Sequence, residues 1–92
     1  MTAATAVPAV AHTHLNQQEL AVLGVLVGFS GRVVSRHELA RQSGLLDRSE
    51  RRCDAILVEI RRILGPTSIR TVRSRGWMLT AEATEAARAL CS

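Results

Sequence analysis

The side chains best suited to chemistry in this sequence are arginines, and they are concentrated between residues 48 and 75. This segment holds eight arginines and three acidic residues, a local net charge of +5, against +4 for the whole chain, so the remainder carries −1. A concentrated positive surface indicates a polyanionic partner. All twelve basic residues are arginine, which suits bidentate contacts with phosphate and guanine. A GC-rich coding bias explains the same composition equally well.

The sequence lacks the residue patterns that enzymes use. It contains no glycine-rich phosphate loop, no histidine and acid at a useful spacing, and no cluster of metal-ligating side chains. His12 and His14 form an HxH pair, but a zinc site needs three or four ligands and no third one stands nearby in the sequence. We therefore expect no catalytic activity, no metal and no cofactor.

The arginine-rich segment starts with a pattern typical of an amphipathic helix. At about 100° per residue, its apolar side chains fall on one side: Cys53, Ile56, Leu57, Ile60, Ile63 and Leu64. The opposite side carries Arg51, Ala55, Val58 and Arg62. Asp47 and Glu50 have the spacing of a capping box, so we expect the helix to begin near Arg48. Gly65, followed by Pro66, should end it.

An arginine-bearing β-hairpin is predicted to follow this helix. Residues 69–73 alternate with period two, and residues 77–80 have β-favouring content. Ser74, Arg75 and Gly76 between them have the composition of a turn. Trp77 is expected in the core, wedging the hairpin onto the helix. A helix with one apolar and one arginine-bearing side, followed by such a hairpin, is the layout of a winged helix.

Two shorter helices are predicted before the arginine-rich segment. Asn16 and Glu19 form a capping box that begins the first of them, which should end near Gly28. A short extended piece follows at residues 32–34.

The second helix should begin with the same device, because Ser35 and Glu38 stand three residues apart. It is expected to run to about Ser43 and to stop at Gly44. The second and third helices then form a helix-turn-helix, in which the third is the candidate DNA-contacting helix.

We therefore predict an α+β fold: a winged helix-turn-helix with a three-helix core, a C-terminal β-hairpin wing and an extra C-terminal helix. Residues 1–14 are expected to form a flexible N-terminal arm and residues 15–80 the winged-helix domain. Residues 81–92 form the tail, with a helix over 81–90 that packs on the domain or mediates self-association.

Composition indicates one small cytoplasmic domain. The chain has 92 residues, of which 47% are hydrophobic, enough for one modest core. No apolar run approaches 18 residues, so no membrane span is expected, and the N-terminus is a poor signal peptide. The two cysteines are too few for a disulfide framework, and we interpret both as reduced thiols.

Three stretches of the sequence resemble OmpR/PhoB-type winged-helix domains. LNQQELAVLGVLVGFSGRVVSRHELAR is similar to the family's L-T-x-x-E-x-x-L-L…G-x-V-V-S-R-E-x-L start. RRCDAILVEIRRILG resembles its R-x-V-D-V-H-I-x-R-L-R-x-x-L helix, and IRTVRSRGWML resembles its I-x-T-V-R-G-x-G-Y-x-L wing. The match runs over residues 15–79 in the right order and spacing.

This resemblance implies a transcriptional regulator, here as a stand-alone domain without a receiver domain. The third helix would enter the major groove of double-stranded DNA and the wing the adjacent minor groove. The matching family positions are Arg51, Asp54 and Arg61 in the helix and Thr71, Val72, Arg73 and Gly76 in the wing, with Trp77 in place of the usual tyrosine. RNA polymerase, another regulator or a second copy of the chain are further candidate partners.

We expect the DNA contacts to come from Arg51, Arg52, Ala55, Val58, Glu59, Arg61, Arg62, Thr71, Arg73 and Arg75. For the helix arginines the alternative is a solvated face with local ion pairs, such as Glu59 with Arg62. Ala55 and Val58 suit either thymine methyl groups or a protein partner. Glu59 would accept a hydrogen bond from cytosine N4, or only lower the local charge.

The wing arginines also have two interpretations. Arg73 and Arg75 flank the predicted turn, where insertion into a narrow minor groove is physically reasonable. Alternatively, they protect an exposed edge strand by charge. The runner-up function is therefore a winged-helix module that binds protein and has lost base-specific contacts with DNA, with the apolar third-helix surface and the tail helix as its interface.

Overall fold

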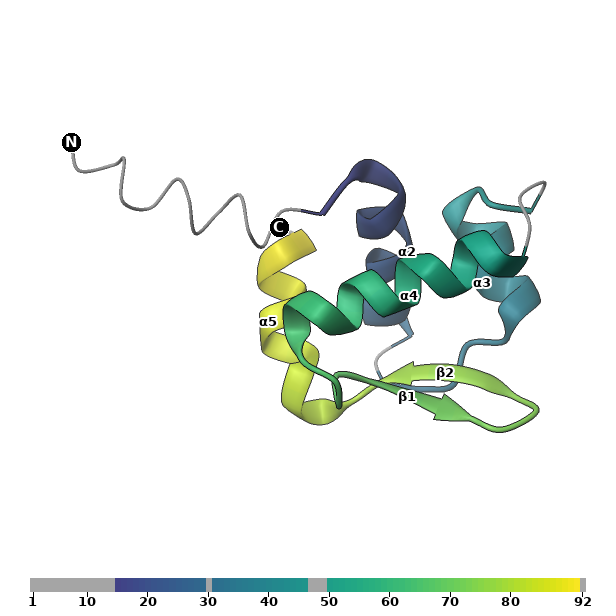
Figure 1. The fold of residues 1–92 in the computed structure, drawn as a ribbon. Coiled ribbons are helices and arrows are strands. Elements are labelled where there is room, and N and C mark those ends of the chain that lie inside the picture. The colour runs from purple at the N-terminus through teal and green to yellow at the C-terminus, as the bar shows by residue number, and fades with distance from the viewer. Residues whose placement is uncertain (1–14, 30, 47–49, 92) are drawn as a thin grey trace.

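The structure, a computed structural model, describes residues 15–29, 31–46 and 50–91. These residues form four helices and one antiparallel hairpin, a small α+β fold compatible with a winged helix (Figure 1). The elements are, in chain order, α2 (Gln17–Gly28), α3 (Arg36–Ser43), α4 (Glu50–Leu64), β1 (Ile69–Val72), β2 (Gly76–Leu79) and α5 (Ala81–Cys91). Their order is the predicted one. The expected arm at 1–14 and the expected cap at Asp47 lie outside the described residues.

Helix α2 begins with the predicted capping box. The Asn16 side chain accepts a 2.8 Å hydrogen bond from the Glu19 amide, and the Glu19 carboxylate accepts one of 2.9 Å from the Asn16 amide. The preceding Leu15 is buried, so the first turn is anchored to the core. The helix ends at Gly28, as predicted.

Helix α3 has only half of the predicted capping box. The Ser35 hydroxyl accepts a 3.1 Å hydrogen bond from the Glu38 amide, but the Glu38 carboxylate does not return to the Ser35 amide. The carboxylate instead accepts hydrogen bonds from the guanidinium of Arg41 and the side-chain amide of Gln42, which lie one turn further along the helix. The predicted reciprocal bond is therefore wrong. Gly44 ends the helix with a φ of 81°, as expected.

Helix α4 buries the predicted apolar side. Cys53, Ile56, Leu57 and Ile60 are buried, and Ile63 and Leu64 pack against the same core. Gly65 follows the last turn with a φ of 115°, a conformation that glycine adopts without steric cost. The opposite side of the helix is exposed.

The hairpin pairs Ile69 with Leu79 and Val72 with Gly76. Strand β1 ends one residue earlier than predicted, at Val72, and β2 is shifted by one residue, because it begins at Gly76 and ends at Leu79 instead of Thr80. Arg73 belongs to the turn, where Ser74 has a φ of 65°. Thr80 leaves the sheet because its carbonyl accepts a hydrogen bond from the Ala83 amide at the start of α5.

The segment before α3 pairs with the hairpin. Val34 and Trp77 form an isolated antiparallel bridge, with N–H···O distances of 2.7 and 2.9 Å. Trp77 is buried, as predicted. At Gly76 the two backbones approach so closely that an added Cβ would lie 1.9 Å from the Val34 carbonyl oxygen. The hairpin is thus fixed to the domain at its second strand.

Helix α5 packs against α2 and α4 through the buried Ala83 and Ala87 (Figure 1). The prediction that the tail helix packs on the domain is confirmed, whereas self-association stays a prediction. Within residues 15–29, 31–46 and 50–91, no helix combines the length and hydropathy needed to cross a bilayer. Cys53 is buried, Cys91 is exposed, and both are free thiols whose pKa is raised by desolvation.

Candidate nucleic-acid interface

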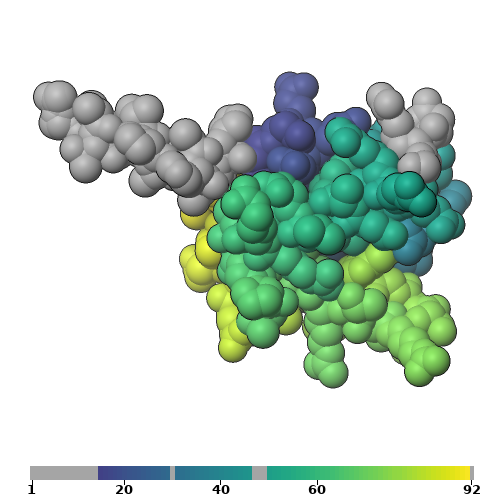
Figure 2. Space-filling model, in the orientation of Figure 1, coloured from purple at the N-terminus to yellow at the C-terminus, as the bar shows by residue number. Residues whose placement is uncertain are grey.

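One face of the molecule carries both α4 and the hairpin. Figure 1 shows α4 crossing the front of the fold with the hairpin below it, and Figure 2 shows the two elements exposed on that same side. A hydrogen bond joins them, because the Arg61 guanidinium of α4 donates to the carbonyl of Ile69 in β1. The elements predicted to enter neighbouring grooves of DNA are therefore held side by side.

The outward side of α4 is a stripe with arginines at its ends and small aliphatic side chains at its centre. It consists of Arg51, Ala55, Val58 and Arg62, and all four are exposed. Spacings of four, three and four residues keep them on one side of a helix. Val58 is 61% exposed and, with Leu46, belongs to the exposed large hydrophobic side chains of the described residues. We call this set the α4 stripe.

Arg52 and Arg62 of α4 have side-chain partners within the helical part of the protein. Arg62 donates to the Glu59 carboxylate, with an Nε···Oε2 distance of 3.1 Å, and this hydrogen bond lowers the pKa of Glu59. Arg52 donates to the side-chain oxygen of Gln18 in α2 at 3.0 Å. The Arg51 side chain, in contrast, makes no hydrogen bond or ion pair with any residue that the structure describes. The pairing of Glu59 with Arg62 is the local ion pair that the sequence offered as an alternative.

The structure brings two predicted DNA contacts together as partners of each other. Arg61 is half-buried. Its guanidinium donates a hydrogen bond of 2.8 Å to the Thr71 hydroxyl and one of 3.0 Å to the Ile69 carbonyl. Its donors are thus directed towards the hairpin. The geometry makes Arg61 a residue that sets the position of the hairpin against α4.

The turn of the hairpin exposes further cations. Arg73 and Arg75 are exposed, as is Arg70 in β1. In residues 15–29, 31–46 and 50–91 none of these three side chains forms a hydrogen bond or an ion pair. Arg70 was not among the expected contacts. Alternation along β1 places it on the face opposite to Thr71, which bonds α4.

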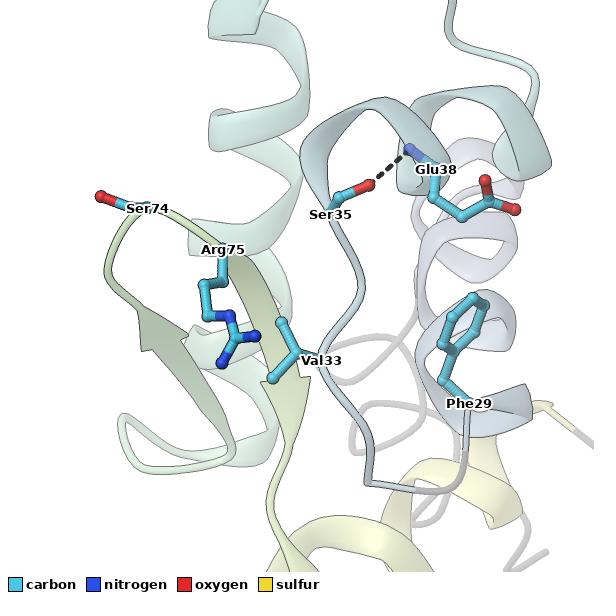
Figure 3. Close-up of a pocket in the computed structure, with 6 residues that line it drawn as sticks. All are labelled: Phe29, Val33, Ser35, Glu38, Ser74 and Arg75. Carbon is cyan, nitrogen blue, oxygen red and sulfur yellow. Dashed lines mark hydrogen bonds between the residues drawn. The ribbon is translucent and has the colours of Figure 1, made fainter.

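A cavity opens between the hairpin turn and the start of α3 (Figure 3). Its lining comes from three segments of the chain: Phe29, Val33, Ser35, Glu38, Ser74 and Arg75. Figure 3 shows the Arg75 side chain extending from the turn towards Val33, whereas the Ser74 hydroxyl points away. A second depression, which Arg75 also borders, is lined by Arg36 and His37. The Arg75 cation therefore borders a concave surface that could receive an anionic group.

Arg36 is a structural residue that the sequence did not reveal. Its guanidinium carbon lies 4.8 Å from the centroid of the Trp77 ring, and its Nη1 lies 3.0 Å from Asp54 Oδ1. One side chain thus contacts β2 and α4 from the first turn of α3. The signal that could have found it is the arginine directly after the Ser35 cap, a position from which a long side chain reaches the neighbouring helix.

No group of three or more histidine, cysteine, aspartate or glutamate side chains that could hold a metal ion occurs among the described residues. No protein-family model, no curated protein and no solved structure matches this chain.

Proposed function

We propose that this chain is a winged-helix domain that binds double-stranded DNA sequence-specifically and regulates transcription in the cytoplasm, without catalysis or a cofactor. Helix α4 would occupy the major groove and the hairpin the adjacent minor groove. The observation that carries the proposal is the common face of α4 and the hairpin, which is lined by exposed arginines and held together by Arg61.

Electrostatics support this proposal. Arg51, Arg73 and Arg75 are exposed and have no ionic partner in the described part of the chain. Their positive charge is therefore available to phosphates, which supply most of the affinity of DNA-binding proteins by releasing condensed counterions. An acidic protein partner would also be attracted, but the division of these cations between a helix and a projecting hairpin suits two grooves of one duplex better.

Dimensions support it as well. Helix α4 has 15 residues and, at about 1.5 Å per residue, is roughly 22 Å long. With side chains a helix is about 10–12 Å in diameter, so the major groove, about 12 Å wide, admits it. The turn at residues 73–75 carries two arginines, the side chain that narrow minor grooves attract most strongly.

Fluorescence anisotropy of a labelled random-sequence duplex, titrated with the protein at several salt concentrations, tests the proposal. We expect micromolar binding at low salt, with log K falling against log salt by about 0.9 per phosphate contact. A slope equivalent to several contacts would support the proposal, and selection from a random library would then define the operator. No binding at the lowest salt concentration would refute it.

A second candidate function is a winged helix that binds protein. It is favoured by one observation, the exposure of two large aliphatic side chains, Leu46 at 55% and Val58 at 61%. RNA polymerase, another regulator or a second copy of the chain would be its partners. Analytical ultracentrifugation and pull-downs with wild type and Val58→Ala separate the two candidates, because only this alternative requires Val58 for a protein complex in the absence of DNA.

A further inference from the structure

The centre of the α4 stripe contains no polar group. Ala55 and Val58 lie between Arg51 and Arg62 on one exposed side of the helix. At about 1.5 Å per residue, the two aliphatic side chains are roughly 4.5 Å apart along the axis and the two arginines roughly 16 Å apart. Base pairs follow each other at about 3.4 Å. The apolar centre therefore matches one or two adjacent base pairs, and the arginines match phosphates or bases beyond them.

The carboxylates that flank this centre are engaged with cations of the protein. Asp54 accepts from Arg36 at 3.0 Å, and Glu59 accepts from Arg62. Each carboxylate keeps further acceptor lone pairs, but its negative charge is balanced by an arginine of the protein. Ile56 and Leu57 are buried. Between the two ion pairs, the middle of α4 therefore presents the methyl groups of Ala55 and Val58.

Charge identifies the occupant of this stripe. An apolar patch bordered by arginines, beside a hairpin with exposed Arg73 and Arg75, complements a polyanion that also offers apolar groups. The major groove of DNA offers one such group, the 5-methyl of pyrimidines, which thymine carries and cytosine acquires on methylation. Valine and alanine contact this methyl without any need for hydrogen bonds.

We propose that Ala55 and Val58 recognise pyrimidine 5-methyl groups in the major groove, so that base selection by α4 depends on methyl contact. This inference rests on the proposed function. It predicts preferred sites in which thymine or 5-methylcytosine stands opposite the centre of the stripe, with phosphates or guanines placed to meet Arg51 and Arg62.

The test uses the tightest-binding duplex that the protein itself recovers from a random library. This duplex is synthesised unmodified and in two series of single replacements. In one series deoxyuridine replaces each thymidine in turn, and in the other 5-methylcytosine replaces each cytosine in turn. Affinities are measured for wild type and Val58→Ala, with Leu46→Ala as the matched control. Leu46 is also an exposed aliphatic residue, but it lies outside α4.

We expect removal of one thymine methyl to weaken wild-type binding about fourfold, the fold change that corresponds to burial of one methyl-sized group. Val58→Ala should lose most of this sensitivity, and Leu46→Ala should retain it. A fourfold gain from one 5-methylcytosine, also lost in Val58→Ala, would equally support the inference and would identify the methylated base as a source of the methyl group.

Salt-dependent binding that no methyl change alters in wild type would overturn the inference and leave DNA binding intact. Sensitivity that Val58→Ala retains in full would also overturn it, because the methyl contact would then lie elsewhere. Absence of duplex binding at low salt would overturn both proposals and favour a protein partner for the stripe. Since Val58 is exposed, its replacement should not impair folding, and circular dichroism verifies this.

Discussion

Arg61 in α4 and Thr71 in β1 are joined by a hydrogen bond of 2.8 Å, and the same guanidinium reaches the Ile69 carbonyl at 3.0 Å. Both Arg61 and Thr71 were expected to contact DNA, yet in the structure their side chains are hydrogen-bonded to each other. The bond fixes the hairpin against the helix. A duplex that fits both elements at once requires this fixed relation, so we expect Arg61 to support binding through the orientation of the hairpin.

Thr71→Val should lower the free energy of unfolding by about 1 kcal/mol, because valine keeps the shape of threonine and removes the acceptor for Arg61. Arg61→Gln should cost at least as much, because it also removes the donor to the Ile69 carbonyl. Urea denaturation measures both effects. In the double variant the loss should be smaller than the two single losses combined, and strict additivity would show that the two side chains do not interact.

Gly76→Ala should destabilise the fold by more than about 2 kcal/mol. The residue has a φ of 140°, and a Cβ there would lie 1.9 Å from the Val34 carbonyl oxygen, so backbone must move. Gly24→Ala is the matched control. Gly24 lies in α2 with nothing within 4 Å of an added Cβ, and alanine there should stabilise the helix by about 0.5–1 kcal/mol.

Thermal unfolding of the two glycine variants distinguishes local strain from a general intolerance of change. A Gly76→Ala protein as stable as wild type would mean that the bridge between Val34 and Trp77 is not as close in solution. Equal destabilisation by both substitutions would contradict the explanation for each of them.

The helices and the hairpin could be predicted because their signals are local. The burial of Ile56, Leu57 and Ile60 follows from helical periodicity, and the end of α4 follows from Gly65. The capping box of Asn16 and Glu19 was also correct, since both partners lie within one turn.

The partners of the charged side chains could not be predicted in the same way. Arg36 and Asp54 are 18 residues apart, and Arg52 and Gln18 are 34 apart, so their pairing depends on how the helices pack. Arg61 sits on the boundary between the two sides of α4, where periodicity does not decide its direction.

The second capping box shows the same limit at short range. The carboxylate of Glu38 has three competing donors within one turn, and a sequence pattern contains only the first of them, the Ser35 amide. Arg41 adds a charge-assisted bond, which is stronger than a neutral one. The candidate site is therefore predictable as a surface, whereas the residues within it that remain available for a ligand are not.

Stability should fall as the solution is acidified through the range in which Glu38 and Glu59 titrate. Hydrogen bonds from Arg41 and Arg62 hold the pKa of these carboxyls below the ordinary value of 4.5. A carboxyl whose pKa is depressed by folding stabilises the protein above its unfolded-state pKa, and this contribution is lost as pH falls through its folded-state pKa. The melting temperature should therefore decline below about pH 4.5.

A Glu38→Gln, Glu59→Gln double variant should melt at a lower temperature than wild type at pH 7 and should lose less on acidification. Glu85→Gln, an exposed acid on α5, is the control and should follow the wild-type profile. The explanation fails if the double variant and wild type show parallel melting profiles from pH 7 to pH 3.

Arg73→Gln and Arg75→Gln should each weaken binding to both random and selected duplexes, because each removes a positive charge that the hairpin turn brings to the phosphates. Each should also reduce the slope of log K against log salt by about 1, the value of one lost phosphate contact. Arg88→Gln removes the same unit of charge from α5, which lies outside the face of α4 and the hairpin, and should leave the slope unchanged. Anisotropy titrations of the three variants at matched salt concentrations measure these differences. An equal effect of Arg88→Gln would mean that net charge alone attracts DNA, whereas an effect confined to the hairpin variants would locate the contact at the turn.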